Sequence, residues 1–428
     1  MQHDPRRDHD HGGLSRREFV GSTALAGAAL VTAPAWLPRA SFARTLAGGP
    51  RDVLVHVYLR GGADGLSIVP PVGDPEYYLR RPTLSIPPPG AANGATALPG
   101  TTLFALSPAA APLLTPYQAG KLLVVHATGL VDPSRSHFDA QKYMELGTTG
   151  AFAGQTTTGW IGRHLASSTP LGNGLLRAMA LQDGLPTALV GGPASLPIKD
   201  PDGFDLAGQL STKAARRLRI ANMYAGEPAP LGPASTATFG TVDLLNGISF
   251  TGYVPANGAV YPNSTFGNQL KWTATMIKAG IGLEAVSIDI GGWDLHAQLG
   301  PLTGTMATKT SDLARAIEAF YLDLSLTHLD QVTLVVMSEF GRRAGENASS
   351  GTDHGHGNCM LVMGGHVVGG QVLSNWPGLA SNQLDNGDLA ITIDHRDILA
   401  EIVLDRLGNP NLGTVFPNYT PTLRGITV

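Results

Sequence analysis

The chain has 428 residues, of which 43% are hydrophobic and 14% are charged, and its formal net charge is -4. This composition excludes a disordered acidic or basic chain, and the small net charge gives no reason to expect nucleic acid as a partner. The length suits one large α/β domain with insertions. A single cysteine, Cys359, excludes an internal disulfide, so packing or bound metal must stabilise the fold.

Residues 1–43 have the pattern of an export signal. Arg16 and Arg17 precede a modest apolar stretch, which ends in small residues. We predict a twin-arginine signal peptide, which implies a periplasmic or secreted protein exported in the folded state; a surface helix with a chance arginine pair is the alternative. Residues 44–428 are predicted to form a single domain with no membrane span in the mature chain, because no apolar run is long enough.

The first half of the mature chain contains two strand-like segments that end at polar side chains. "DVLVHVYLR" stops at a glycine pair before Asp64, and "KLLVVHATG" leads into a turn and a helix start that contain Arg135 and Ser136. Residues 150–265 are rich in Gly, Ser, Thr and Pro. We predict that they form a loop-rich insertion or cap over the strand ends.

The second half repeats the same design. "LEAVSIDIGG" is followed by Asp294 and His296, which face the same side if the chain stays extended. A helix with apolar side chains at helical spacing then leads into "QVTLVVM", which Glu339 follows. This alternation predicts an α/β fold with a largely parallel central sheet between helices. In such sheets the ligand crevice lies along the carboxyl ends of the strands.

The segment "GTDHGHGNCM" gathers Asp353, His354 and His356 between glycines. In an extended loop the two histidines project to one side, while Asp353 is either a ligand or an outer partner that orients an imidazole. A glycine-rich turn with half-exposed histidines is the alternative for this segment alone. The predicted metal ligands also include the side chains that follow the other strands: Asp64, Asp294, His296 and Glu339. Oxygen and nitrogen donors without a thiolate suit one or two zinc, manganese, iron or calcium ions.

Ser136 is the candidate nucleophile, and Arg135 is the candidate residue for binding an oxyanion. A metal ion would activate the serine at the helix start, and the guanidinium would bind a phosphate or sulfate group in bidentate fashion. Two alternatives remain open: a metal-activated water replaces the serine, or Ser136 is only the N-cap of the helix.

Six segments in this order resemble the family catalogued as domain of unknown function 1501: "SRREF", "LRGGADGL", "DPSRSHFDAQ", "GGWDLH", "SEFGRR" and "GTDHGHGN". That family consists of exported bacterial proteins grouped with the alkaline phosphatase and sulfatase superfamily. The resemblance implies an alkaline phosphatase-like fold with a metal site at the strand ends. It matches the superfamily's ligand positions to Asp64, Asp294, His296, Glu339, and His354 or His356.

Two departures from the superfamily pattern narrow the expected chemistry. Val131 stands where sulfatases carry cysteine or serine, which argues against a formylglycine sulfatase. "SEFG" replaces the usual "DHG", which puts a second metal ion in doubt. We expect an exported metal-dependent hydrolase of phosphate or sulfate esters, with a small or polymer-borne substrate. The alternative is a non-catalytic envelope protein of this fold that binds a metal, a partner or a glycan.

Overall fold

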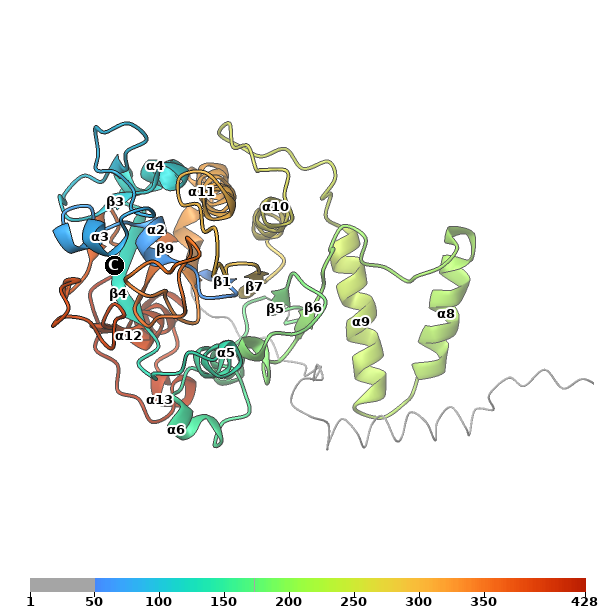
Figure 1. Ribbon diagram of the computed structural model, residues 1–428. Coiled ribbons are helices and arrows are strands. Elements are labelled where there is room, and N and C mark those ends of the chain that lie inside the picture. Colours follow the sequence, from blue (N-terminus) through green and yellow to red (C-terminus); the bar gives the residue numbers. More distant parts are fainter. Residues whose placement is uncertain (1–50, 173) are drawn as a thin grey trace, which may run out of the picture.

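The computed structural model describes residues 51–172 and 174–428 (Figure 1). The predicted signal peptide, residues 1–43, lies outside the described residues. Within the described part of the chain, no helix is long and apolar enough to cross a membrane.

Nine strands form the central sheet. They are β1 (Val53–Leu59), β4 (Leu122–Gly129), β5 (Ala178–Ala180), β6 (Ser195–Pro197), β7 (Ala285–Ile290), β8 (Val332–Met337), β9 (Asn358–Gly364), β10 (Gln371–Leu373) and β11 (Ile393–Asp394). The order across the sheet is β10-β4-β9-β8-β1-β7-β5-β6, and β11 also pairs with β4. β9 runs antiparallel to β4 and β8, whereas the other pairs are parallel. The predicted α/β fold with a largely parallel central sheet is therefore confirmed.

Helices cover the sheet, and a separate small hairpin pairs β2 (Thr96–Ala97) with β3 (Ala105–Leu106). The α-helices are α2 (Gly65–Ile68), α3 (Pro75–Arg80), α4 (Leu114–Gln118), α5 (His137–Leu146), α6 (Gly150–Ala153), α7 (Trp160–Ser167), α8 (Lys213–Tyr224), α9 (Leu231–Asn246), α10 (Thr265–Lys278), α11 (Thr305–Leu324), α12 (His395–Glu401) and α13 (Leu412–Val415). The structure also has the 3-10 helices η1 (Pro108–Leu113), η2 (Thr187–Leu189), η3 (Leu210–Thr212) and η4 (Leu329–Gln331) and the π-helix η5 (Ile402–Arg406).

The sheet separates two hydrophobic cores. Along β1, Val55 and Val57 face the core that contains α10 and α11, while Leu54 and Tyr58 face the core that contains α5, α7 and α12. Successive side chains of a strand point to opposite faces, so a strand covered on both sides is apolar at nearly every position. This explains why the strands appear in the sequence as short continuous apolar runs.

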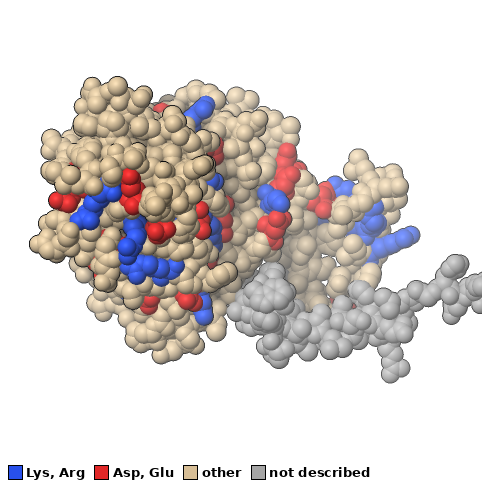
Figure 2. Space-filling model, in the orientation of Figure 1, with Lys and Arg blue, Asp and Glu red and all other residues tan. Residues whose placement is uncertain are grey.

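Residues 150–265 contain more regular structure than the loop-rich insertion expected from their composition. β5 and β6 extend the central sheet beyond β7, and α8 and α9 form a hairpin that projects from the main body (Figure 1). Figure 2 shows basic side chains gathered on α8, and Arg217 of α8 pairs with Asp243 of α9 at 2.5 Å. Three-residue strands between glycine and proline turns are too short to give a sequence pattern of their own.

Candidate metal centre

Side chains from three separate segments meet where the parallel strands end. His137 begins α5, Asp294 follows β7, and His354 precedes β9. One ligand atom of each residue lies within 4.8 Å of those of the other two. His296 adjoins this group, with its Nε2 atom 2.9 Å from Nε2 of His354 and 2.9 Å from Oδ1 of Asp294. Three imidazoles are thus arranged around one carboxylate, and we call these four residues the His/Asp cluster.

All three imidazoles turn their Nε2 atoms toward the cluster, because their Nδ1 atoms are held by partners on the other side. Each Nδ1 atom meets an acceptor: Glu339 for His137 (2.8 Å), the main-chain oxygen of Arg135 for His354 (2.9 Å), and Asp353 for His296 (3.0 Å). Carboxylates and carbonyl oxygens only accept hydrogen bonds, so each Nδ1 atom must carry the proton. In the neutral ring the lone pair then lies on Nε2, the atom that faces the cluster.

Glu339 orients His137 from behind the cluster. Its Oε1 atom accepts hydrogen bonds from the His137 ring, from Gln141 Nε2 at 2.9 Å and from the Gly61 amide at 2.8 Å, and its Oε2 atom accepts one from Ser338 at 3.0 Å. Burial favours the neutral acid, but these hydrogen bonds outweigh it and lower the pKa of Glu339. The hydrogen bond to Glu339 in turn raises the pKa of His137.

Arg342 holds Asp294 in place and keeps it ionised. The buried guanidinium donates to Oδ1 of Asp294 at 2.6 Å and to the main-chain oxygens of Gly62 at 2.6 Å and Thr352 at 3.0 Å, so it ties three loops together. Partial burial favours protonation of Asp294, but the hydrogen bond and the positive charge of Arg342 prevail and lower its pKa to about 2. Asp294 is therefore an anion at neutral pH.

Two glycines allow the loops of the cluster to approach one another closely. A Cβ atom on Gly61, whose φ is +118°, would lie 2.6 Å from the main-chain nitrogen of Asp294. A Cβ atom on Gly351 would lie 2.3 Å from the carbonyl carbon and oxygen of His296. Real side chains do not tolerate such contacts, so these positions require glycine. The glycines bring backbone against backbone and so set where Asp294 and His296 stand.

Asp64, a predicted ligand, is not in the His/Asp cluster. Its carboxylate is buried and forms a two-pronged ion pair with Arg81, at 2.5 Å and 3.0 Å, and it also accepts a hydrogen bond from Ser67 at 2.5 Å. The guanidinium of Arg81 continues to the main-chain oxygens of Arg343 and Ala344, at 2.9 Å and 3.0 Å. Both oxygens of the Asp64 carboxylate are therefore bonded to Arg81 and not directed to the cluster.

His356, another predicted ligand, also has other partners. Its Nδ1 atom lies 2.7 Å from Asp385, and its Nε2 atom lies 3.0 Å from the main-chain oxygen of Leu130. His354 and His356 therefore both contact the loop 130–135, but at opposite ends of it.

Ser136 and Arg135 lie beside the cluster in partly structural roles. Ser136 is the N-cap of α5, and its hydroxyl accepts a hydrogen bond of 3.4 Å from the amide of Asp139. The Arg135 guanidinium donates to Asp388 from Nε at 3.0 Å and from one terminal nitrogen. Its side chain keeps 37% of its surface exposed, so the guanidinium remains open to solvent.

His137 is the residue of the cluster that sequence analysis missed. It lies inside "DPSRSHFDAQ", directly after Ser136, and it occupies the first position of α5. Its Nε2 atom is buried and has no hydrogen-bond partner among the described residues, while Oδ2 of Asp294 lies 3.5 Å away. A histidine at a helix start that follows a strand end was the available signal.

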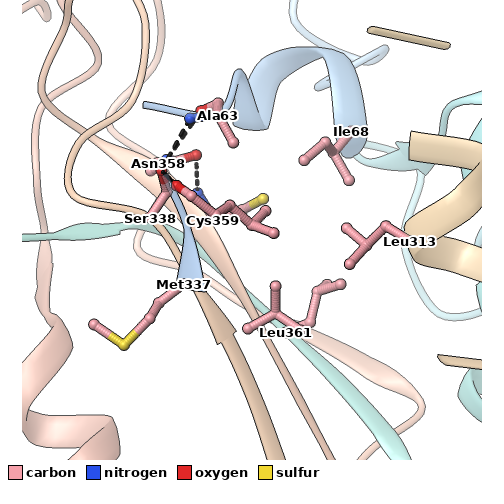
Figure 3. Close-up of a pocket in the computed structure, with 10 residues that line it drawn as sticks. Ala63, Ile68, Leu313, Met337, Ser338, Asn358, Cys359 and Leu361 are labelled. Atoms are coloured by element: carbon pink, nitrogen blue, oxygen red, sulfur yellow. Dashed lines mark hydrogen bonds between the residues drawn. The ribbon is translucent and has the colours of Figure 1, made fainter. Parts of the chain in front are cut away.

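Cys359 lies behind the cluster and lines a small cavity with Ile68 and Leu361 (Figure 3). Burial raises the pKa of its thiol to about 12, so it stays protonated. The neighbouring Asn358 donates to the main-chain oxygens of Ala63 at 3.0 Å and Phe340 at 2.8 Å, which ties the start of β9 to the cluster loops. Cys359 is thus a core residue.

Comparison with known proteins supports the family resemblance. A family model described as "Protein of unknown function (DUF1501)" matches residues 237–407. The match includes Asp294, His296 and His354 and confirms the resemblance over that part of the chain. None of the curated proteins matches the sequence.

Several solved structures share a distant likeness with the chain. Ps i-CgsB, in complex with k-i-k-neocarrahexaose, is 8% identical with a TM-score of 0.35, over 85% of this chain and 74% of that chain. Lipooligosaccharide phosphoethanolamine transferase A from Neisseria meningitidis is 10% identical with a TM-score of 0.30, over 84% and 60%. The phosphonate monoester hydrolase of Agrobacterium radiobacter is 11% identical with a TM-score of 0.29, over 87% and 79%.

Proposed function

We propose that the protein is an exported, metal-dependent hydrolase of phosphate or sulfate esters. His137, Asp294 and His354 hold a divalent ion, and His296 adjoins as a further ligand. The observation that carries this proposal is the orientation of the imidazoles, whose Nε2 lone pairs point toward an ionised carboxylate.

The cluster needs a positive charge at its centre. With Nδ1 protonated, the Nε2 atoms of His296 and His354 present lone pairs to each other at 2.9 Å and to Asp294 at 2.9 Å and 3.1 Å. Lone pairs and an anion at these distances repel one another unless a cation or a shared proton lies between them. Metal–nitrogen bonds of about 2.0–2.1 Å place neighbouring ligand atoms about 3 Å apart, so the observed separation fits a shared ion.

The site favours a catalytic over a purely structural ion. A catalytic ion keeps one coordination position open to water or substrate, and an ion with five or six positions does so even with His296 as a fourth protein ligand. Asp294 keeps 43% of its side-chain surface exposed, and His137 and His354 keep 24% and 22%. A substrate can therefore reach the cluster from solvent. Because Asp64, Glu339 and His356 have other partners, we propose one ion.

The residues around the cluster have separate tasks in this proposal. A divalent ion held there acts as a Lewis acid on an ester oxygen. Arg342 keeps Asp294 ionised, and Arg135 is the proposed contact for the substrate's oxyanion once its guanidinium turns from Asp388. Ser136, adjacent to His137, is the proposed nucleophile, and water is the alternative. The substitution Ser136→Ala distinguishes them, because only a serine mechanism loses turnover completely.

Export by the twin-arginine route is part of the proposal. It rests on the paired Arg16 and Arg17 and the apolar stretch that follows. A protein that acquires its metal before export would use a route that carries folded chains. Expression with Arg16→Lys and Arg17→Lys should keep the chain inside the cell, and unchanged secretion would contradict this part.

Elemental analysis of the purified mature protein tests the metal site. We expect about one equivalent of a divalent metal in the wild type, and its loss in His137→Ala and His354→Ala. His366→Ala is the matched control, because it removes a histidine remote from the cluster. Folded His354→Ala protein with full metal content would contradict the assignment.

Chromogenic esters test the catalytic part. p-Nitrophenyl phosphate, bis(p-nitrophenyl) phosphate and p-nitrophenyl sulfate are assayed before chelation, after chelation and after metal is restored. We expect turnover of at least one ester to disappear on chelation and to return with the metal. Metal binding without turnover of any ester would instead support a non-catalytic envelope protein.

A further inference from the structure

A second pocket lies at the same edge of the sheet as the His/Asp cluster. It has a volume of about 310 Å³, within the usual range for small-molecule sites, and it lies where β7 ends and where α10 and α11 begin. Trp293 lines this pocket, while the next residue, Asp294, belongs to the cluster. The loop 291–294 therefore separates the two sites, so one ligand of modest size could reach both.

The floor and one wall of the pocket are apolar. Ile290 at the end of β7, the buried ring of Trp293 and Leu313 of α11 supply these surfaces. These surfaces offer contact area to C–H groups, and the side chains of Ile290 and Leu313 form no hydrogen bonds. A ligand that fills the pocket must therefore have an apolar face.

The remaining lining carries hydrogen-bonding groups with unused capacity. The Trp293 indole Nε1 is buried and has no partner among the described residues, which is costly unless a ligand or water accepts its proton. Lys309 Nζ lies 5.8 Å from the Trp293 ring centroid and donates to the main-chain oxygen of Gly291 at 2.9 Å, which uses one of its three protons. The Asp312 carboxylate has no ion-pair or hydrogen-bond partner within residues 51–172 and 174–428. Thr308 adds a hydroxyl at the rim.

These groups exclude three kinds of ligand. An anion would meet the carboxylate of Asp312, and a cation would meet the ammonium of Lys309. A purely apolar ring would bury the Asp312 carboxylate without a partner, which a site built for hydrogen bonding penalises strongly. An uncharged ring with hydroxyl groups and an apolar face satisfies all of them.

We propose that this pocket binds an uncharged, hydroxyl-bearing ring of the sugar type. Its C–H face contacts Ile290 and Leu313, and its hydroxyls bond to Lys309, Asp312 and the Trp293 indole. If the proposed hydrolase function holds, on which this link rests, the ring is the alcohol part of the ester. The substrates are then phosphate or sulfate esters of sugars.

Binding of simple sugars to the mature protein tests the pocket without any turnover. Methyl β-D-galactopyranoside, methyl β-D-glucopyranoside and methyl α-D-mannopyranoside are the probes, and saturation-transfer NMR is the readout. In Thr308→Trp, a bulky ring from the exposed rim fills the pocket. Ala307→Trp is the matched control, because Ala307 precedes Thr308 on α11 and lines only the adjoining groove, which Thr308 also borders.

We expect the wild type and Ala307→Trp to bind at least one probe and Thr308→Trp to bind none. No binding to the wild type, or equal binding to Thr308→Trp, would overturn the inference. The probes carry no ester and need no metal, so this result is independent of the hydrolase proposal. Metal content of the same Thr308→Trp sample shows whether the neighbouring cluster is intact.

Discussion

Glu339 accepts a hydrogen bond of 2.8 Å from Nδ1 of His137, a residue 202 positions earlier in the chain. The pair joins the end of β8 to the start of α5, and it fixes both the tautomer and the direction of the imidazole. A carboxylate behind a histidine strengthens the histidine as a metal ligand without contacting the ion. Glu339 is thus important to the site in a way that its place at a strand end did not reveal.

Replacing Glu339 with glutamine should weaken metal binding. The amide keeps the size of the side chain but removes the negative charge, so the His137 ring is less basic and less firmly oriented. We expect a loss of metal affinity of about 10- to 100-fold, the range found for such outer partners. Competition with a chromogenic chelator measures it. Asp353→Asn, which loosens only the adjoining His296, should cost less, and equal affinity in Glu339→Gln would refute the role.

The sequence was sufficient to predict the fold class because its strands are buried on both faces. The runs that form β1, β4, β8 and β9 are apolar at most positions, and each ends at glycine or directly before a polar residue. Strand ends then indicated one edge of the sheet, and the structure brings Asp294, His296 and His354 together there.

The sequence did not show which polar residues near the strand ends belong to the cluster. That depends on the partners of their side chains, which a strand pattern does not encode. Asp64 also follows a strand, but it forms an ion pair with Arg81, 17 residues later in the chain. His137 was overlooked because the direction of a side chain in the first turn of a helix depends on how the helix packs. Tertiary contacts therefore decide which side chains near a strand end face the cluster.

The Asp64–Arg81 pair should support stability rather than metal binding. Both side chains are buried, so Arg81→Met leaves an unpaired carboxylate inside the protein, at a cost of about 3–5 kcal/mol. Asp64→Asn should also lower the free energy of unfolding. The folded Asp64→Asn protein should nevertheless keep its metal, as elemental analysis would show. Loss of metal from this variant would restore Asp64 to the ligand set.

Acid should destabilise the protein through three buried histidines. Burial lowers the pKa of His56 and His164 to about 3 and that of His126 to about 4. Below pH 6.5 these histidines take up protons in the unfolded chain but stay neutral in the folded chain. Their contribution to the free energy of unfolding is therefore fully present above pH 6.5 and is lost as the pH falls toward 3–4. Each histidine contributes up to about 1.4 kcal/mol per pH unit in this window.

Chemical denaturation between pH 7 and pH 4.5 measures this loss. In His56→Leu one of the three titrating groups is removed, so the free energy of unfolding should fall less steeply with pH, whatever its value at pH 7. His366→Leu is the control and should keep the wild-type slope. Identical slopes in His56→Leu and the wild type would show that His56 is not held neutral in the fold.

Adding one methyl group at Gly351 should disturb the cluster through the main chain of His296. In Gly351→Ala the new Cβ atom would meet the main chain of His296 at 2.3 Å, and backbone cannot move aside as a flexible side chain can. We expect a stability loss of about 1–3 kcal/mol, typical of overpacking, together with weaker metal binding as His296 shifts. Gly154→Ala is the matched control, because a Cβ atom there meets nothing within 4 Å. If thermal unfolding and metal affinity are the same in both variants, the close approach of these loops does not position His296.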